Sequence, residues 1–313
     1  MLGKKTYPIL MINITNKSNT LRTAIATAIV KVSLPETIKA IIDRQVPKGD
    51  VFEMSKAAGL LAVKKTSNMI PDCHPIPIEY ASITFNISEL EIHINVEVHT
   101  IYKTGVEVEA IHAATVVAVT IYDMLKPIDK NITIEKVKLL EKTGGMSQFR
   151  KKEPKGITAA VIVCSDSVSV GNKEDKAGKQ IIERLKTHGV NIKSYEIIPD
   201  DKNIITDKVN YYSSESIQLL IFTGGTGLSP RDVTPEVLEP LLDFRIPGIE
   251  EAMRSYGQQR TPYAMLSRSL AGIVGKTLVL ALPGSTRGAS ESVDAIFPSV
   301  LHIYRVMKGV RHD

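Results

Sequence analysis

A glycine-rich segment at residues 223–236, TGGTGLSPRDVTPE, has the residue types of an anion-binding loop. It directly follows the apolar run SIQLLIF. Glycines permit sharp turns and close approach of the backbone, and successive N–H groups at the end of a strand can bind an anion. Thr223 and Thr226 add hydroxyl donors. The segment therefore predicts a phosphate-binding loop, with a simple tight turn as the alternative.

Two aspartates follow different predicted strands and could act together. Asp200 lies in IIPDD and Asp232 in SPRD. Two carboxylates from separate strand ends could hold one Mg²⁺ on a polyphosphate. In the alternative interpretation Asp232 only caps a helix over VTPEVLEPLL, a role for which Thr234 competes. Polar residues at two further strand ends, SDS and PGS, favour the binding site.

A second group of chemically capable residues lies in VKKTSNMIPDCHPIPI, residues 63–78. Prolines flank Cys73 and His74 and hold this segment extended. Because adjacent residues of an extended chain point to opposite sides, the pair is poorly placed to share one metal ion. We expect a buried cysteine, with His74 as a hydrogen-bonding or anion-contacting group.

Asp123 and Lys126 close a long apolar stretch that begins near Glu107 and Glu109. Their spacing places them on one face of a helix, where an ordinary ion pair is one interpretation. An unpaired charge in apolar surroundings would instead have a shifted pKa. A lysine whose pKa is depressed toward neutrality could serve as a general acid or base.

The elements of the C-terminal half alternate between strand and helix. A helix is predicted over 175–189, with Ile181, Ile182 and Leu185 on one face, Asp175 as its cap and Gly189 at its end. The predicted strands cover 157–167, 190–201, 216–227 and 275–285. This order indicates an α/β fold with a doubly wound, mostly parallel sheet. Ligands of such sheets lie beyond the carboxyl ends of the strands.

The N-terminal half is typical of an α+β fold. Residues 78–88 and 90–103 alternate apolar and polar types, as half-buried antiparallel strands do. We interpret 105–126 as a buried helix, although its β-branched residues also suit a strand, and 133–140 as a further strand. Two strands, a helix and a strand suggest a ferredoxin-like sheet with helices on one face.

The length of the chain, 313 residues, suggests two globular domains. We place them at 1–150 and 157–313, joined by a linker at 151–156 within the polar stretch 141–156. Two cysteines, Cys73 and Cys164, are too few for a disulfide framework or a four-cysteine zinc site. The net charge of +5 is spread along the chain and does not suggest nucleic-acid binding. Neither a signal peptide nor a run of 18 apolar residues is found, so we expect a cytoplasmic protein that does not cross a membrane.

The C-terminal half resembles the molybdopterin-binding MogA/MoaB family over residues 157–310. The resemblance is carried by TGGTGLSPRDVTPE, IPDD, LSRSLAGIVGKTLVLALPGS and the SDS strand end. It implies adenylylation of the terminal phosphate of molybdopterin with Mg-ATP, with Asp200 and Asp232 as the functional aspartates and Mg²⁺ ligands. A catalytically silent pterin-binding or scaffold module is the alternative. The implied ligand-binding residues are Ser165, Asp166, Thr223, Gly224, Gly225, Thr226, Gly227, Pro283, Gly284 and Ser285.

The N-terminal half resembles cyclic pyranopterin monophosphate synthase, the MoaC family, over residues 10–149. The resemblance is carried by KGDVFEMSKAAGLLAVKKTSNMIPDCHP and KTGVEVEAIHAATVVAVTIYDMLK. It implies conversion of 3′,8-cyclo-7,8-dihydroGTP to cyclic pyranopterin monophosphate and pyrophosphate, with no cofactor. The family builds its site between subunits, so a homo-oligomer with threefold symmetry, a trimer or hexamer, is implied. The implied catalytic residues are Lys48, Asp123 and Lys126, and the implied substrate-binding residues are Arg22, Lys64, Asp72, Cys73, His74, Glu107, Val108, Glu109 and Lys142.

Three residues depart from the usual pattern of that family. Asn13 stands where Asp is usual, Asp72 replaces a common Leu before Cys-His, and Met146 stands where a Lys usually follows the paired glycines. The last change removes one phosphate-binding cation. Because the proposed chemical groups are retained, we still expect activity.

Overall fold

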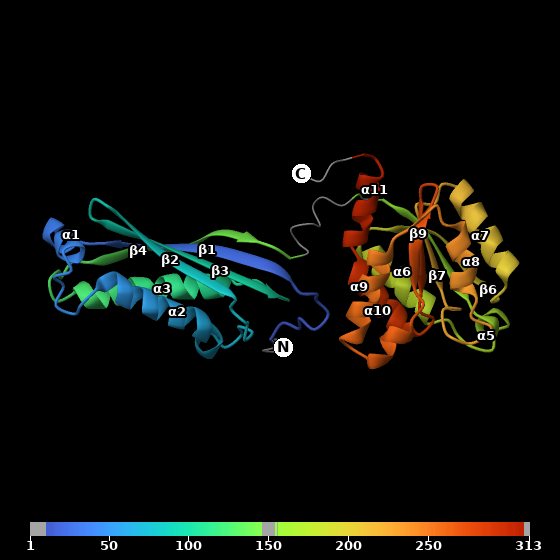
Figure 1. Ribbon diagram of the computed structural model, residues 1–313, viewed down its shortest axis with the longest axis horizontal. Coiled ribbons are helices and arrows are strands. Elements are labelled where there is room, and N and C mark those ends of the chain that lie inside the picture. The colour runs from blue at the N-terminus through green and yellow to red at the C-terminus, as the bar shows by residue number, and fades with distance from the viewer. Residues whose placement is uncertain (1–10, 146–153, 155, 310–313) are drawn as a thin grey trace, which may run out of the picture. The chain divides into compact units, whose positions relative to one another are not determined.

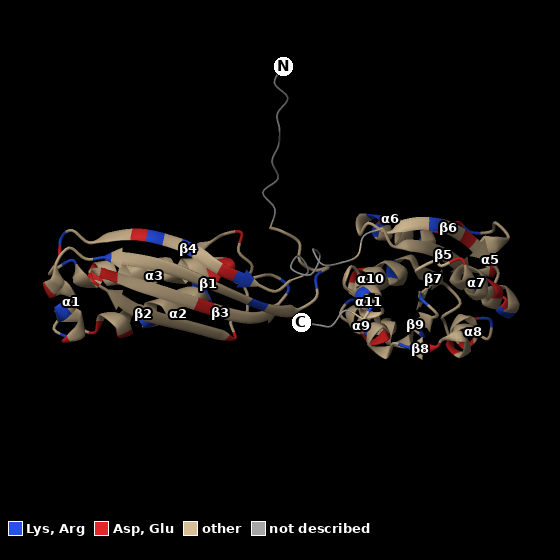
Figure 2. Cartoon of the chain, turned by 90° about the horizontal axis from the view of Figure 1, so that it is seen from above, with Lys and Arg blue, Asp and Glu red and all other residues tan. Residues whose placement is uncertain are grey.

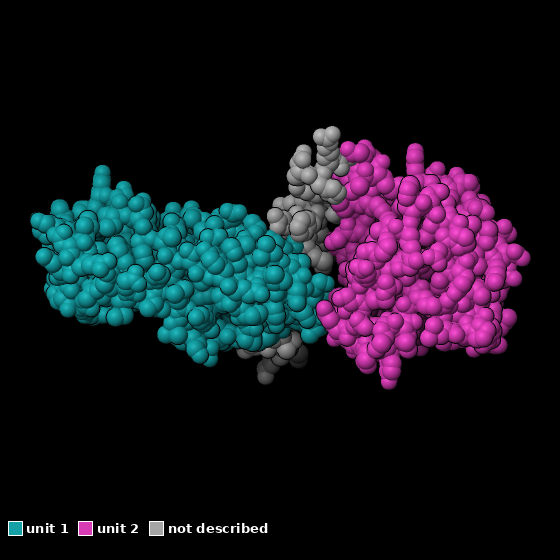
Figure 3. All heavy atoms as spheres, in the orientation of Figure 1, with its two compact units in different colours: residues 1–148 teal, residues 149–313 magenta. Residues whose placement is uncertain are grey.

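The chain divides into two compact units, residues 1–148 and 149–313 (Figure 3). The computed structural model describes residues 11–145, 154 and 156–309. Each unit has its own sheet and its own hydrophobic core (Figure 1). Met146 and most of the predicted linker at 151–156 lie outside the described residues.

The sheet of the N-terminal unit is antiparallel and four-stranded. Its order is β2 (Tyr80–Ser88), β3 (Glu91–Tyr102), β1 (Thr20–Lys31) and β4 (Thr133–Thr143). The strands predicted at 78–88, 90–103 and 133–140 are confirmed. The central strand β1 was not predicted, because its buried side chains are mostly alanines, which give a weak apolar signal.

Two long helices, α2 (Val51–Met69) and α3 (Glu107–Leu125), pack on one face of this sheet (Figure 1). The buried side of α3 is rich in small residues such as Ala110, Ala114 and Ala118, so the helix lies close against the strands. A Cβ atom at Gly59 of α2 would lie 2.5 Å from Val117 of α3. The helix interpretation of 105–126 is confirmed, and the chain order, with the short helix α1 (Pro35–Ile42) after β1, is compatible with a ferredoxin-like arrangement.

Helix α3 is long enough and apolar enough to cross a membrane, judged by length and composition alone. Its 18-residue window has a mean hydropathy of 1.4, and 50% of that window is buried inside the unit. The core helix of a globular domain has the same properties, and the packing of α3 on the sheet accounts for them.

The sheet of the C-terminal unit has six strands. Their order is β6 (Asn191–Ile198), β5 (Thr158–Cys164), β7 (Leu219–Thr223), β10 (Thr277–Leu282), β9 (Leu270–Val274) and β8 (Phe244–Arg245). The first four are parallel to one another, and β9 and β8 continue the sheet antiparallel. The predicted α/β fold with a mostly parallel sheet is confirmed; the antiparallel edge was not predicted.

Helices cover both faces of this sheet (Figure 1). Alternate residues of β5 belong to different cores: Val161 to one face and Ile162 to the other. The first face carries α6 (Ala177–Thr187), α9 (Pro247–Gln258) and α10 (Thr286–Ile296), and the second carries α7 (Lys202–Ser214) and α8 (Thr234–Leu238). The remaining pieces are short: α5 (Asp166–Ser169), α11 (Ile303–Val306) and turns of 3₁₀ helix at Glu239–Leu241, Pro262–Leu266 and Ser299–His302.

The ends of α6 agree with the sequence prediction. The carboxylate of Asp175 accepts a hydrogen bond from the Gly178 amide at 3.0 Å, and Gly189 follows the helix with φ +75°. Basic and acidic residues are interspersed along the elements of both units (Figure 2).

A buried carboxylate, Asp129, ties the segment after α3 to the start of α1. Its oxygens accept hydrogen bonds from the Ser33 amide and hydroxyl (2.7 and 2.5 Å), from Thr37 Oγ1 (3.2 Å) and from the Asn131 amide (3.1 Å). Burial raises the pKa of Asp129, but these donors outweigh burial and hold that pKa below its ordinary value. The Asp129 amide donates to the Leu125 carbonyl at 3.0 Å, at the end of α3.

Replacing Asp129 with Ala should lower the free energy of unfolding by about 2–4 kcal/mol at pH 7, because buried donors lose their acceptor. The folded-state pKa is the lower one, so this stabilisation is present above the unfolded pKa and is lost as pH falls through the folded pKa. Urea unfolding at pH 7 and pH 3 measures both effects. The exposed Asp43 provides the control, Asp43→Ala, and equal losses in the two variants would contradict the assignment.

Candidate functional site

Asp166 and Asp200 are linked at the carboxyl ends of β5 and β6. The Asp200 amide donates to Asp166 Oδ1 at 3.1 Å, and the Asp166 amide donates to Asp200 Oδ2 at 3.2 Å. The other oxygen of Asp200, Oδ1, is buried and has no hydrogen-bond partner within the described residues. Burial and the negative charges of Asp166 and Asp232 raise the pKa of Asp200. The hydrogen bond from the Asp166 amide and the charge of Arg231 act to lower this pKa, but they do not cancel the rise. A buried carboxylate oxygen without a donor fits a cation ligand.

The glycines of the TGGTG loop are required by close backbone packing. Gly224 has φ +101°, and a Cβ atom there would lie 2.1 Å from the Cys164 carbonyl oxygen. At Gly225, with φ +61°, it would lie 2.8 Å from Asp200 Oδ1, and at Gly284 it would lie 2.9 Å from Gly224 Cα. The loop is therefore both a tight turn and a close neighbour of the strand-end carboxylate.

Asp232 does not cap a helix, so that alternative is wrong. Helix α8 begins at Thr234 without a side-chain cap, and Asp232 Oδ2 instead accepts from the Ser229 amide at 2.8 Å. The hydroxyl of Thr223 donates to the Pro283 carbonyl at 2.9 Å, so it joins two loops in the structure. Asp201, the neighbour of Asp200, caps α7.

A cavity of about 690 Å³ opens at these strand ends. It brings together residues predicted from separate motifs: Ser165, Asp200, Thr223, Gly224, Gly225, Asp232, Gly284 and Ser285. Lys173 and Lys176, from the loop before α6, also line it and were missed by sequence reasoning. The polar segment GNKEDKAG between a strand and a helix was the available signal. Lysines and carboxylates that line one cavity provide groups that can hold a metal-bound polyphosphate.

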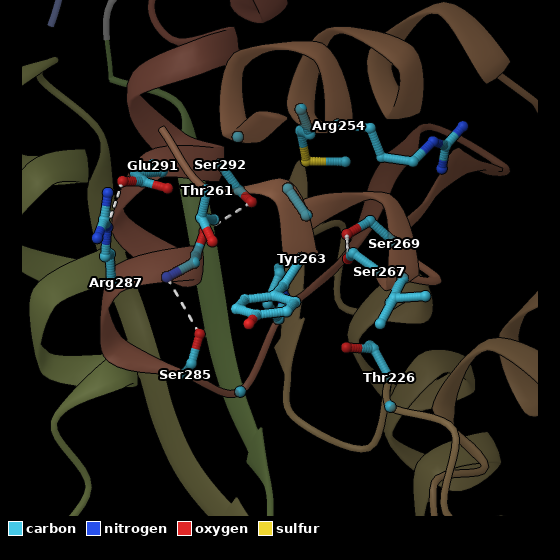
Figure 4. Close-up of a pocket in the computed structure, with 18 residues that line it drawn as sticks. Thr226, Arg254, Thr261, Tyr263, Ser267, Ser269, Ser285, Arg287, Glu291 and Ser292 are labelled. Atoms are coloured by element: carbon cyan, nitrogen blue, oxygen red, sulfur yellow. Dashed lines mark hydrogen bonds and ion pairs between the residues drawn. The ribbon is translucent and has the colours of Figure 1, made fainter. Parts of the chain in front are cut away.

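A second cavity of about 320 Å³ adjoins the first and shares Gly284 and Ser285 with it. Thr226, Gly227 and Pro283 line this second cavity. The other contributing residues, which sequence reasoning missed, include Arg254, Thr261, Tyr263, Ser267, Ser269 and Arg287 (Figure 4). Several come from RTPYAMLSRS, whose polar and aromatic residues precede a strand. Ser285 itself caps α10 by accepting from the Gly288 amide at 3.2 Å.

In the N-terminal unit, one cluster of charges lies at the C-terminal end of α3. Asp123 accepts from Lys48 Nζ at 2.6 Å and from Lys126 Nζ at 2.7 Å. These hydrogen bonds lower the pKa of Asp123 to about 2 and raise the pKa of Lys126. The prediction of a lysine whose pKa is depressed toward neutrality is therefore wrong. The side chains of Lys126 and Asp123 are half exposed and paired with each other, rather than buried and alone.

A second cluster lies at the N-terminal end of α3. Lys142 Nζ donates to Glu107 Oε1 at 2.6 Å. Burial raises the pKa of Glu107, but the Lys142 hydrogen bond and the charges of Lys142 and Arg22 hold that pKa below its ordinary value. Burial lowers the pKa of Arg22, and the negative charge of the nearby Glu107 offsets only part of this effect. A Cβ atom at Gly145 would lie 1.8 Å from Arg22 Nη1, so the paired glycines lie against this guanidinium.

Cys73, His74 and Glu109 are placed at this same end. The Cys73 thiol donates to Glu109 Oε1 at 3.2 Å, and Glu109 Oε2 is buried without a partner within the described residues. Burial, together with Glu109, raises the pKa of Cys73 to about 12, and burial raises the pKa of Glu109. His74 Nε2 contacts the Ile12 carbonyl oxygen at 2.9 Å. The contact of His74 agrees with the expected hydrogen-bonding histidine. The expectation of a buried cysteine is wrong, because Cys73 is only partly buried.

The two clusters do not meet within one chain. With a rise of 1.5 Å per residue, the helix from Glu107 to Asp123 is about 24 Å long. Lys64, Asp72 and Val108 are exposed, and Asn13 holds its own turn by accepting from the Thr15 amide at 2.9 Å. Within the described residues, no group of three or more His, Cys, Asp or Glu side chains could hold a metal ion by itself.

Comparisons with known proteins cover both units. Residues 11–145 match the MoaC family, and residues 160–302 match a probable molybdopterin binding domain. A molybdenum cofactor biosynthesis bifunctional protein of Chlorobaculum tepidum is 38% identical over 96% of each chain. The chain belongs to the bifunctional molybdenum cofactor biosynthesis proteins.

Other relatives of this bifunctional protein cover the whole chain or one half. The protein of the same name from Synechococcus elongatus is 34% identical over 96% of this chain and 98% of its own. A cyclic pyranopterin monophosphate synthase of Listeria monocytogenes is 47% identical over 46% of this chain and 89% of its own. The bifunctional protein thus joins two parts of molybdenum cofactor biosynthesis in one chain.

The Asp123 carboxylate of the bifunctional protein should titrate near pH 2, well below the ordinary value of 3.8. Replacing Lys126 or Lys48 with Ala should raise that pKa, because each ammonium group stabilises the ionised form. A ¹³C NMR titration of the carboxyl carbon measures it, with the exposed Lys65→Ala as control. An Asp123 pKa that does not respond to either change would show that these ion pairs do not persist in solution.

Proposed function

We propose that the N-terminal domain, residues 1–150, converts 3′,8-cyclo-7,8-dihydroGTP to cyclic pyranopterin monophosphate with release of pyrophosphate. The match to the MoaC family and to relatives named as that synthase supports this reaction. The substrate carries a triphosphate, so several cations are needed to bind it. Arg22, Lys142, Lys64 and Lys48, with His74, are the groups proposed to hold it.

The separation of the two clusters by the length of α3 is the observation that supports a site shared between two copies. An exposed stripe on α3 runs between the clusters and contains Val108, Thr115, Val119 and Tyr122. These positions repeat every three, four or seven residues, so they lie on one side of the helix. Two copies that dock antiparallel along this stripe would each present the Asp123 cluster to the partner's Glu107 cluster. Such a twofold contact is compatible with the proposed hexamer, and a trimer would need a different arrangement.

The charge states of the Asp123 cluster suggest how it acts. The raised pKa of Lys126 keeps its ammonium group protonated, so Lys126 is suited to stabilise developing negative charge. Asp123 stays ionised and orients both Lys48 and Lys126 through hydrogen bonds of 2.6 and 2.7 Å. We therefore assign Lys126 as the group that stabilises negative charge developing on the substrate, and Asp123 as the group that positions Lys126.

For the C-terminal domain, residues 157–313, we propose that molybdopterin is adenylylated with Mg-ATP. The terminal phosphate oxygen of molybdopterin would attack the α-phosphorus of ATP, and the bond to pyrophosphate would break. Asp200 and Asp232 would hold Mg²⁺, whose charge neutralises the phosphates, and Lys173 and Lys176 would contact them. Because the two cavities meet at Gly284 and Ser285, each can receive one substrate with the reacting phosphates between them.

Variants of the full chain can test the shared N-terminal site by complementation. Lys126→Ala and Lys142→Ala should each lower synthase activity by at least about 100-fold, because each removes a charge that the transition state needs. When the two variants are refolded together, mixed dimers should contain one intact site, and about a quarter of the wild-type activity should return. Mixtures that stay inactive would show that each site is formed by one chain. Lys65→Ala, refolded with either variant, controls for the refolding step.

A second experiment separates the activities of the two domains. Asp200→Asn and Asp232→Asn should lower adenylylation of molybdopterin by about 100-fold and leave synthase activity unchanged. Lys126→Ala should show the opposite pattern, so each variant serves as the control for the other. Binding of molybdopterin by the wild-type chain without adenylylated product would instead identify a pterin carrier. The substrates are soluble metabolites, which fits the proposed cytoplasmic location.

A further inference from the structure

Arg268 holds the loop between the TGGTG segment and α8 from outside the cavities. Its Nε donates to the Gly227 carbonyl oxygen at 2.8 Å, and its Nη2 donates to the Asp232 carbonyl oxygen at 2.7 Å. Its Nη1 pairs with Glu236 on α8. One planar guanidinium group therefore bridges the two ends of the Gly227–Asp232 segment and joins them to the following helix.

The segment that Arg268 bridges has Asp232 folded back into it. The Asp232 carboxylate accepts from the Ser229 amide at 2.8 Å, and the Asp232 amide donates to the Ser229 carbonyl at 2.9 Å. A Cβ atom at Gly227 would lie 2.8 Å from Asp232 Oδ2. The carboxylate thus lies directly against the backbone of Gly227, so the separation of Gly227 and Asp232 decides where the carboxylate lies. Asp232 lines the 690 Å³ cavity and Arg268 does not.

We propose that Arg268 is a positioning residue that fixes Asp232 for binding of Mg-ATP, and this role rests on the function proposed for the C-terminal domain. The carbonyl-bridging contact needs two N–H donors in a fixed plane. Lysine keeps the charge but presents a single ammonium group that cannot reproduce this fork. The conservative change Arg268→Lys therefore removes the bridge without removing the charge.

The test is a double-variant cycle in the full chain, with the affinity for Mg-ATP measured by calorimetry. Arg268→Lys and Asp232→Asn should each weaken binding roughly tenfold, as the loss of a partner that orients a metal ligand commonly does. If Arg268 acts through Asp232, the double variant binds no more weakly than Asp232→Asn alone. Wild-type affinity in Arg268→Lys, or a double variant that shows the product of both losses, would overturn the proposal.

Arg184→Lys is the matched control. Its side chain is 30% exposed, as is that of Arg268, and it pairs with Asp294 at 3.0 Å on helices α6 and α10. This variant should bind Mg-ATP as the wild type does. The unfolding temperature of each variant is measured as well, and a lowered value would identify a variant that has lost stability. A changed affinity in Arg184→Lys would show that the loss of any partly buried arginine weakens binding.

Hydrogen exchange tests whether Arg268 holds the loop, independently of Mg-ATP. A wild-type chain that does not bind Mg-ATP would refute the function proposed for this domain, and this measurement would still report on the loop. Amides of the segment 227–234, including that of Ser229, should exchange several-fold faster in Arg268→Lys than in the wild type or in Arg184→Lys. Unchanged exchange there would show that Arg268 does not hold the loop.

Discussion

The rigid length of α3 is the constraint on which the account of the N-terminal unit depends. Buried alanines fix this helix against the sheet, so its two ends cannot approach each other. Each end carries charged groups that the sequence resemblance assigns to a single site. In one chain these groups neutralise each other locally, Lys142 with Glu107 and the two lysines with Asp123. We therefore propose that a complete site for a triphosphate requires a second copy, with the exposed stripe of α3 as the contact surface.

In the C-terminal unit, residues proposed to form the site line one cavity within a single chain. Parallel strands bring their carboxyl ends to one edge of the sheet, so Asp166, Asp200 and the TGGTG loop meet although they are far apart in sequence. Glycines allow the loops to touch at backbone distance. Catalysis in this unit would not depend on assembly, whereas catalysis in the N-terminal unit would. The two activities should therefore respond differently to dilution of the protein.

Much of the fold could be predicted from the sequence where the apolar period is strong, as in β3, α3 and β5. The alanine-rich β1 and the two-residue strand β8 carry too little apolar signal, and both occupy positions set by tertiary pairing. The strand-end residues of the C-terminal site could be predicted because their motifs are distinctive. Lys173 and Lys176 could not, because surface lysines are common. The direction of the Lys126 pKa shift follows from its pairing with Asp123, the local ion pair that the sequence offered as one interpretation. The sequence does not show that both side chains are half exposed, which decides between that pair and a buried lysine.

A short amine-reactive cross-linker tests the shared N-terminal site most directly. Lys126 and Lys142 lie at opposite ends of α3, so a short linker cannot join them within one copy. Lys48 and Lys126 both contact Asp123, so the linker can join them within one copy. This link is the control that shows the linker has reacted. After separation on a denaturing gel, mass spectrometry should find the Lys126–Lys142 link in the dimer band and the Lys48–Lys126 link in the monomer band. A dimer band without the Lys126–Lys142 link would contradict a site that is completed by a second copy.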